Sequence, residues 1–441
     1  MRHWFRDRHF RSLLKNSSYL AVSKAVSAVA GLAAIAFAGR GLGLVLFGLL
    51  VLIRSYAQAA SGLTKFQSWQ LIVRYGGDAL GGGDQSRFKR AIGFGLGLDI
   101  VSGLAGMAVA IALLPLIGHW FGIPDDYLIL AMLYCLALPV MGAATPVGVL
   151  RSLDRFDLIG WQGSSYPIVR AVLAGIAWAQ GASFETFLLI WLATDVGGEL
   201  FLWFLAWREL GRREMRRGIR PTLRPDGLAG AWRFAIHVNL TVSLQTAWGP
   251  IARLVVGGFV GPAAAGLYRI AASLADSAQK PADLIARAYY PEVVRMDFAT
   301  KAPWKLMLRG TALAAMVGIV AIAVVLLAGE ALLDLLFGAE FLGAYPVLVV
   351  LMAVPLLAML SFPLPPMLYA LDRPDGPLKA RLVGTLAYFA IVAPLAWNFG
   401  VTGAAAAYVA GYALMVLVLV LQLRSEHRRV RPPRAPAPGE R

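Results

Sequence analysis

Residues 16–75 read NSSYLAVSKAVSAVAGLAAIAFAGRGLGLVLFGLLVLIRSYAQAASGLTKFQSWQLIVRY, and this stretch decides the fold. It contains two apolar segments, 17–38 and 44–64, separated by a Gly-rich turn. Each segment has the length of about 20 residues that a helix needs to cross a bilayer. Each also contains one cation, Lys24 in the first and Arg54 in the second. A charge at that depth costs roughly 2.5–3.5 kcal/mol, so it normally faces a partner or a water-filled cavity.

The composition of the whole chain is that of a membrane protein. Hydrophobic residues make up 59% of it and charged residues 15%, whereas soluble domains carry about 25% charged residues. The net charge of +16 does not indicate a nucleic-acid partner, because the cations lie between the apolar runs. The single cysteine, Cys135, excludes a disulfide framework, and the five histidines show no metal-ligand spacing, so we expect no metal or cofactor.

Hydropathy predicts an all-α polytopic membrane protein with twelve transmembrane helices in two pseudo-symmetric six-helix lobes. A cleaved signal peptide is an alternative for the first segment, but the run is long, holds Lys24 and leads into a second apolar segment. The predicted spans are 17–38, 44–64, 89–117, 127–150, 158–178, 184–207, 235–259, 264–286, 309–328, 344–370, 380–398 and 402–423.

These spans divide the chain into five parts. Residues 1–16 form a basic, amphipathic cytoplasmic segment, 17–207 the N-terminal lobe, 208–234 a basic linker, 235–424 the C-terminal lobe, and 425–441 a basic, Pro-rich tail that we expect to be disordered. With both termini in the cytoplasm, 34 of the 41 Lys and Arg residues fall on cytoplasmic segments and one on the outer turns. This asymmetry predicts that orientation.

An internal repeat appears at an offset of about 218 residues. Leu153-Asp154-Arg155-Phe156-Asp157 matches Leu371-Asp372-Arg373-Pro374-Asp375, and a Gly-x-x-x-x-Gly-Leu pattern begins at both Gly43 and Gly261. Six spans separate the copies, so both halves enter the membrane in the same direction. The repeat therefore predicts two lobes related by an axis along the membrane normal, with the substrate site between them. It also pairs the polar first and second spans with the seventh and eighth.

The pattern resembles a known family. The motifs that carry the resemblance are Gly41-Leu-Gly-Leu-Val-Leu-Phe-Gly48, Ile72-Val-Arg-Tyr75, Val260-Gly-Pro-Ala-Ala-Ala-Gly266-Leu-Tyr268 and Leu335-Leu-Phe-Gly338. Over about residues 12–424 the chain is similar to the polysaccharide or O-antigen flippases (Wzx type) of the multidrug/oligosaccharidyl-lipid/polysaccharide exporter superfamily. Lipid II flippases of this superfamily usually have two further helices, and its drug exporters usually place acidic residues where this chain has Lys24 and Arg54.

The resemblance implies a lipid-linked oligosaccharide as substrate, and its pyrophosphate needs fixed cations along a hydrated path. Arginine suits this task because its planar fork meets phosphate oxygens in pairs. The candidate substrate-binding residues are Lys24, Arg54, Arg253 and Arg269. The alternative for each is a structural ion pair or a side chain that reaches the interface. Neither of the first two spans offers an acidic partner, whereas Arg170 can pair with Asp195 or Glu199 on the next span.

Other charged residues are candidates for coupling or gating. Asp99, Asp195 and Asp276 are intramembrane carboxylates that can bind a coupling ion, although pairing with a neighbouring cation explains each equally well; Lys280 lies one turn from Asp276. Asp154 and Asp372 belong to the repeated turns, which can latch the lobes together or simply cap a helix end.

The leading hypothesis is a flippase of the bacterial inner membrane that moves an undecaprenyl-pyrophosphate-linked sugar to the outer leaflet by alternating access, for polysaccharide, lipopolysaccharide or O-antigen synthesis. Its expected partners are the lipid-linked substrate, the bilayer and polysaccharide polymerase or assembly proteins. An ion-coupled multidrug exporter is the alternative, but cationic drugs favour an acidic cavity. An enzyme is not expected, because the outer loops are short and contain no cluster of catalytic carboxylates or histidines.

Overall fold

The computed structural model describes residues 8–142, 144–294, 296, 300, 302–371, 373 and 375–430. Within these ranges every regular element is a helix, as expected for an all-α membrane protein. Six helical segments are long and apolar enough to cross a membrane, and two of them, Ser23–Gly77 and Asp375–Glu426, run for 55 and 52 residues and contain internal kinks. The count of twelve spans stays a prediction.

The chain divides into two units, Met1–Gly266 and Leu267–Arg441. The predicted lobes meet at a linker that ends at 234, whereas α8 (Ala231–Val260) here packs with the first unit, against α1 (Arg8–Thr64). The lobe boundary therefore stays a prediction.

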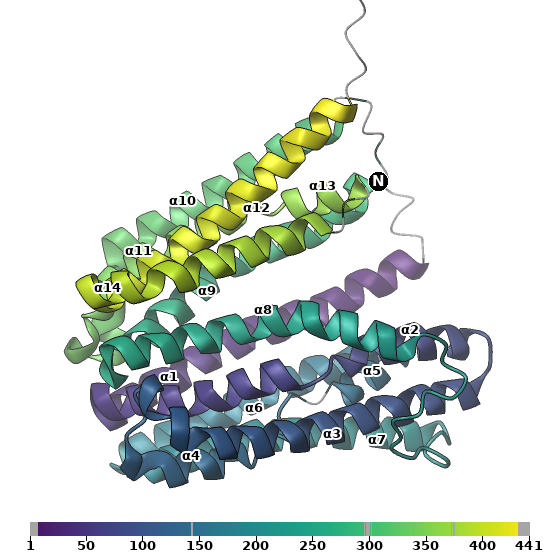
Figure 1. Cartoon of the computed structure of the whole chain (residues 1–441), viewed down its shortest axis with the longest axis horizontal. Coiled ribbons are helices and arrows are strands. Elements are labelled where there is room, and N and C mark those ends of the chain that lie inside the picture. The colour runs from purple at the N-terminus through teal and green to yellow at the C-terminus, as the bar shows by residue number, and fades with distance from the viewer. Residues whose placement is uncertain are drawn as a thin grey trace, which may run out of the picture. The chain divides into compact units, whose positions relative to one another are not determined.

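In the first unit, α1 lies between α8 and α6 (Phe156–Ala179), and α6 packs on α7 (Phe184–Arg212). The long helices run side by side in Figure 1. Helix α1 covers the first two predicted spans and also part of the segment 1–16, which was expected to be a basic, amphipathic cytoplasmic segment. It kinks at Gly43, whose φ of 69° and ψ of 174° lie in a region that only glycine enters readily. The predicted Gly-rich turn is thus confirmed.

A short amphipathic helix, α2 (Ser68–Gly81), was not expected in the predicted cytoplasmic segment. Its buried face, Leu71, Ile72 and Tyr75, packs on α3 (Gln85–Ile117) and α5 (Thr145–Ser152), while Val73 and Arg74 are exposed. The side chain of Asp84 caps α3 by accepting the Arg87 amide N–H at 2.9 Å.

The predicted fourth span is broken. Helix α4 (Leu128–Cys135) ends ten residues before α5 begins. Between them lie Pro139, which has no N–H to donate, and Gly142, which has a φ of 66°. Two short 3-10 turns, η2 (His119–Phe121) and η3 (Asp125–Tyr127), precede α4.

The tenth predicted span is broken in the same way, in the second unit. It consists of α11 (Ala344–Leu351), α12 (Ala353–Ser361) and α13 (Leu364–Ala370), after the 3-10 turn η4 (Ala339–Phe341). These pieces pack against α14 (Asp375–Val430) and α10 (Ala302–Phe337). The second unit also contains most of α9 (Pro262–Val294). Helix α14 kinks at Gly400 and runs to Val430, so the tail is helical beyond 425, where disorder was expected.

The backbone supports the internal repeat. The amide of Arg155 donates to the Leu150 carbonyl at 2.8 Å, and 218 residues later Arg373 donates to Leu368 at 2.9 Å. Gly261 repeats the backbone conformation of Gly43, with a φ of 105° and a ψ of 171°. The same turns are therefore built at matching positions, although superposition of whole lobes stays a prediction.

The linker between the predicted lobes is folded onto the first unit. The amide of Thr222 donates to the Gly93 carbonyl of α3 at 3.0 Å. A side chain at Gly93 or Gly97 would collide with the linker backbone at Arg220 or Thr222. Leu228 is buried in the same core as α2 and α3. The segment is thus a packed part of this unit.

Candidate functional site

Asp195 on α7 is the centre of a charged cluster inside the first unit. Arg54 from α1 binds it with two parallel hydrogen bonds, Nε to Oδ2 at 2.9 Å and Nη2 to Oδ1 at 3.0 Å. Arg170 from α6 donates to Oδ1, and the Tyr134 hydroxyl from α4 donates to Oδ2 at 2.6 Å. Four helices therefore meet on one carboxylate. Two guanidinium groups share a single negative charge, which leaves the cluster with a net positive charge.

The two arginines differ in their surroundings. Arg170 is 8% exposed, donates through Nε to Thr194 at 2.7 Å and lies over the rings of Tyr166 and Trp191. Arg54 is 19% exposed, and both of its hydrogen bonds use Nε and Nη2. Within the described residues its Nη1 has no hydrogen-bond partner, nor is it a buried unsatisfied atom, so this end of the fork is accessible.

The pairing of Arg170 with Asp195, one of two partners expected from the sequence, is confirmed. The argument that Arg54 lacks an acidic partner is wrong, since it considered only the first two spans and Asp195 comes from the sixth. Sequence reasoning also missed Tyr134, which lies in an apolar run and gives no signal of a polar contact.

Arg253 on α8 reaches the same turn of α1 that carries Arg54. Its Nε donates to Ser55 Oγ at 2.7 Å and its Nη2 to Gln58 Oε1 at 3.0 Å. Two of the four candidate substrate-binding residues are thus gathered around positions 54–58 of α1.

Lys24 is exposed on α1. Two serines beside it bind α6: Ser23 donates to the Gly160 carbonyl at 2.7 Å and Ser27 to the Gly163 carbonyl at 2.5 Å. They tie two helices together, a common use of serine within membranes.

The remaining candidates of the eighth span lie on α9 in the second unit. Arg269 and Lys280 are half-buried, and Asp276 is exposed. A site shared by Arg269 and Arg54 stays a prediction.

Polar side chains support the broken fourth span. Asp99 on α3 accepts the Thr145 amide at 2.9 Å and the Ser68 hydroxyl at 2.7 Å. It therefore caps the first turn of α5, where a negative charge is favourable. These bonds give Asp99 a structural role, and a coupling role stays untested.

Two further side chains contact the segment between α4 and α5, where the fourth span is broken. Neither was predicted from the sequence to belong to a site. The ammonium group of Lys65, buried at the end of α1, donates to the Pro139 carbonyl at 2.8 Å. Glu199, one turn beyond Asp195 on α7, accepts the Gly142 amide through Oε1 at 3.3 Å. The signal in the sequence that could have indicated Glu199 is its position, four residues after Asp195 on the same predicted span. From the sequence alone it is expected only as a possible partner of Arg170.

Each repeated Leu-Asp-Arg-x-Asp turn is bonded within its own unit. Arg155 binds Asp157 at 2.8 Å and Glu209 of α7 at 2.5 Å, and its hydrogen bonds hold the pKa of the Asp157 carboxyl below its usual range. Asp154 is exposed and has a φ of 57°. Asp372 lies outside the described residues.

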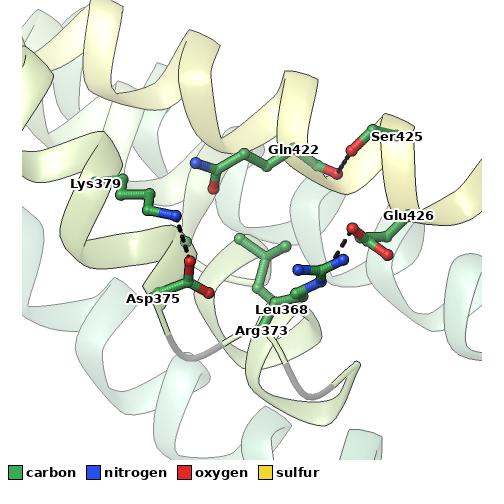
Figure 2. Close-up of a pocket in the computed structure, with 8 residues that line it drawn as sticks. Leu368, Arg373, Asp375, Lys379, Gln422, Ser425 and Glu426 are labelled. Carbon is green, nitrogen blue, oxygen red and sulfur yellow. Dashed lines mark hydrogen bonds and ion pairs between the residues drawn. The ribbon is translucent and has the colours of Figure 1, made fainter.

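In the second copy, Arg373 binds Glu426 at 3.1 Å and Lys379 binds Asp375 at 2.5 Å. These pairs line a small pocket of about 130 Å³ together with Leu368, Gln422 and Ser425 (Figure 2). The four charges cancel, so the pocket has no net charge with which to attract an anion.

Comparison with known proteins identifies the family. Residues 13–296 match the family described as "Polysaccharide biosynthesis protein". The chain belongs to this family. The chain is 40% identical over 348 residues to "Inner membrane protein YghQ" of Escherichia coli (strain K12). The matched region covers 78% of this chain and 98% of that relative.

Solved structures show the fold of this family member to be that of the superfamily expected from the sequence. An inward-facing multidrug resistance MATE family transporter of the MOP superfamily has a TM-score of 0.71 at 15% identity, covering 91% of this chain and 95% of that one. Lipid II flippase MurJ in an inward closed conformation also has a TM-score of 0.71, at 13% identity, covering 93% and 89%.

Proposed function

We propose that the protein is a flippase of the bacterial inner membrane that carries a polyprenyl-pyrophosphate-linked oligosaccharide from the cytoplasmic to the outer leaflet by alternating access. The proposal is supported by membership of a polysaccharide biosynthesis family and by a relative named as an inner membrane protein. The cargo would serve polysaccharide or lipopolysaccharide assembly, including O-antigen, and a polymerase would receive it outside.

The observation that carries the proposal is the accessible end of Arg54. Asp195 holds this guanidinium through Nε and Nη2, so its orientation is fixed, while Nη1 remains accessible. A preoriented arginine loses little conformational freedom when it binds a pyrophosphate oxygen. Arg170 supplies the second positive charge of the cluster, which keeps the site attractive to an anion although one carboxylate is present.

Arg253 extends this cationic surface along α1. Its Nε and Nη2 donate to Ser55 and Gln58, which orient the guanidinium. Lys24, on the exposed side of α1, extends the proposed path within the first unit, and Arg269 on α9 is a separate candidate for head-group binding in the second unit. A dianionic head group would pass along these cations while its lipid tail stays in the bilayer.

Substitution of Arg54 in a strain that lacks its own flippase tests the proposal. Arg54→Ala should abolish most polymer export at equal protein level, Arg54→Lys should retain part of it because the charge remains without the fork, and Arg54→Glu should be worst. If Arg54→Glu exports polymer at the wild-type level, the cationic site is wrong.

A charge swap separates substrate binding from simple stabilisation. In Arg54→Asp/Asp195→Arg the pair between positions 54 and 195 can form again, so the folded protein should recover part of the thermal stability that Arg54→Asp loses, although Arg170 loses its bond to Asp195. Flipping should not recover, because the accessible cation has moved to α7. Recovery of both would show that Arg54 serves only the structure. Efflux of cationic dyes by the wild type, without polymer export, would instead support the multidrug exporter.

A further inference from the structure

The interior of the first unit contains three carboxylates, Asp99, Asp195 and Glu199, with very different hydrogen bonding. An ionised carboxylate offers about four acceptor positions. Asp195 receives four donors from two arginines and a tyrosine. Asp99 receives the Ser68 hydroxyl and the Thr145 amide at ordinary distances. The surrounding donors therefore favour the charged form of both groups.

Glu199 has much weaker support. Within the described part of the chain it accepts one hydrogen bond, from the Gly142 amide at 3.3 Å, which is longer than the usual 2.9–3.0 Å. No cation lies within ion-pair distance of it among these residues; Lys65, whose positive charge acts on it from farther away, donates to the Pro139 carbonyl instead. A half-buried carboxyl group with one weak donor has open positions for a proton.

The position of Glu199 connects its charge to the break in the fourth span. Gly142 adopts a left-handed φ of 66° between α4 and α5, and its N–H points to Glu199 on α7. The other side-chain bonds to this segment come from the end of α1 and the residue that follows it: Ser61 donates to the Met141 carbonyl at 3.4 Å, and Lys65 to the Pro139 carbonyl. The Glu199 bond is therefore the one that ties the glycine hinge to α7.

We propose that Glu199 is a proton-binding site that fastens the hinge at Gly142 to α7 when ionised and loosens it when protonated. The proton comes from water and adds to a carboxylate oxygen. A neutral carboxyl is a weaker acceptor for the Gly142 N–H than a carboxylate, since charge-assisted hydrogen bonds are stronger. The broken span would then respond to pH at its hinge.

The charged groups around Glu199 set its sensitivity. Asp195 precedes it by one turn on α7, Lys65 follows the end of α1, and Asp99 faces it from α3. Arg54 of α1, Arg170 of α6 and Tyr134 of α4 are engaged by Asp195. Lys65 favours the ionised form, and the two aspartates oppose it.

Infrared difference spectroscopy of the purified full chain tests the site without any transport assay. Lowering the pH from alkaline to acidic should produce a C=O stretching band of a protonated, half-buried carboxyl group. Glu199→Gln should lose this band, because the amide keeps the shape and the acceptor but takes up no proton. Glu185→Gln, at the other end of the same helix, should keep it. Persistence of the band in Glu199→Gln would overturn the proposal.

Hydrogen exchange reports on the hinge. After correction for the intrinsic rate at each pH, amides of 136–142 should lose protection several-fold on acidification in the wild type and in Glu185→Gln. In Glu199→Gln their protection should not change with pH, and a wild-type-like dependence there would contradict the proposal.

If Glu199→Gln fails to fold, Lys65→Gln provides a second variant. Loss of the positive charge should move the midpoint of the carboxyl band to higher pH. An unchanged midpoint would also count against the site. Neither readout depends on the cargo, so the proposed flippase function can fail independently.

Discussion

Arg155 and Arg373 occupy the same position in the two copies of one motif, and each binds a glutamate on a long helix of its own unit. Arg155 reaches Glu209 on α7, and Arg373 reaches Glu426 on α14. The arginines are 218 residues apart and the glutamates 217. In both units the end of a broken span is thereby fastened to a long helix. The sequence had allowed a latch between lobes; the observed bonds lie within each unit.

The two arginine–glutamate pairs should contribute unequally to stability. Glu209 is 7% exposed and also accepts from Arg213 at 3.1 Å, whereas Arg373 is 45% exposed. Glu209→Gln should therefore lower the unfolding free energy by about 1.5–3 kcal/mol, the range for hydrogen bonds to charged groups. Glu426→Gln should cost under about 1 kcal/mol, as exposed pairs do. Thermal unfolding in detergent measures both; equal losses would contradict the structural comparison.

The Arg155–Asp157 pair should make stability depend on acidic pH. Hydrogen bonding to Arg155 lowers the folded-state pKa of Asp157 below the value of about 3.9 in unfolded chains. The resulting stabilisation is fully present above the unfolded pKa and is lost as pH falls through the folded pKa. Asp157→Asn should remove this part of the acid dependence and leave stability near neutral pH lower than in the wild type. Melting curves over an acidic pH series give the comparison, with Asp226→Asn on the linker as the control.

Gly261 should not tolerate a side chain. Its φ of 105° and ψ of 171° are accessible essentially to glycine alone, although the space around it is open. Gly261→Ala should therefore destabilise the protein through backbone strain of about 1–3 kcal/mol. Gly31, which is helical and also has open space, is the matched control. Gly31→Ala should be neutral or stabilising by up to about 1 kcal/mol. Similar melting temperatures for the two variants would contradict the conformational argument.

A side chain at Gly97 should detach the linker. Its Cβ would overlap the Thr222 carbonyl, which is backbone and cannot rotate away. Gly97→Val should consequently speed tryptic cleavage after Arg216 or Arg217. Gly77→Ala, at a position without close neighbours, should leave the cleavage rate unchanged. Cleavage of Gly97→Val at the wild-type rate would show that the linker does not need this contact.

Much of the fold follows from the sequence because membrane helices have a strong hydropathy signal. The kink at Gly43, the repeat at Gly261 and the family were predictable from glycine spacing and motifs. The breaks in the fourth and tenth spans were not, because hydropathy stays high across Pro139 and Gly142, and membrane helices tolerate both residue types. Breaks of this kind depend on side chains from other helices that satisfy the freed backbone groups.

The candidate site was predictable in part. An arginine within an apolar run marked Arg54 and Arg170 as unusual, and the partner of Arg170 lay close in sequence. The partner of Arg54 is 141 residues away, and no local pattern indicates it. Tyr134 and Lys65 gain their roles only through packing: a tyrosine in an apolar run and a lysine at a helix end are ordinary residues until a distant carboxylate or carbonyl lies opposite.

The docking of the linker on Gly93 and Gly97 has a consequence for biosynthesis. The core formed by α2, α3 and α7 includes Leu228 and Ala231, so it stays incomplete until the ribosome has made these residues. Helix α8 then adds to α1, which was inserted about 200 residues earlier in synthesis. The first unit therefore has to wait in the membrane, with part of its core uncovered, while the chain that closes it is still emerging. A chaperone or insertase that shields this surface would act during that interval.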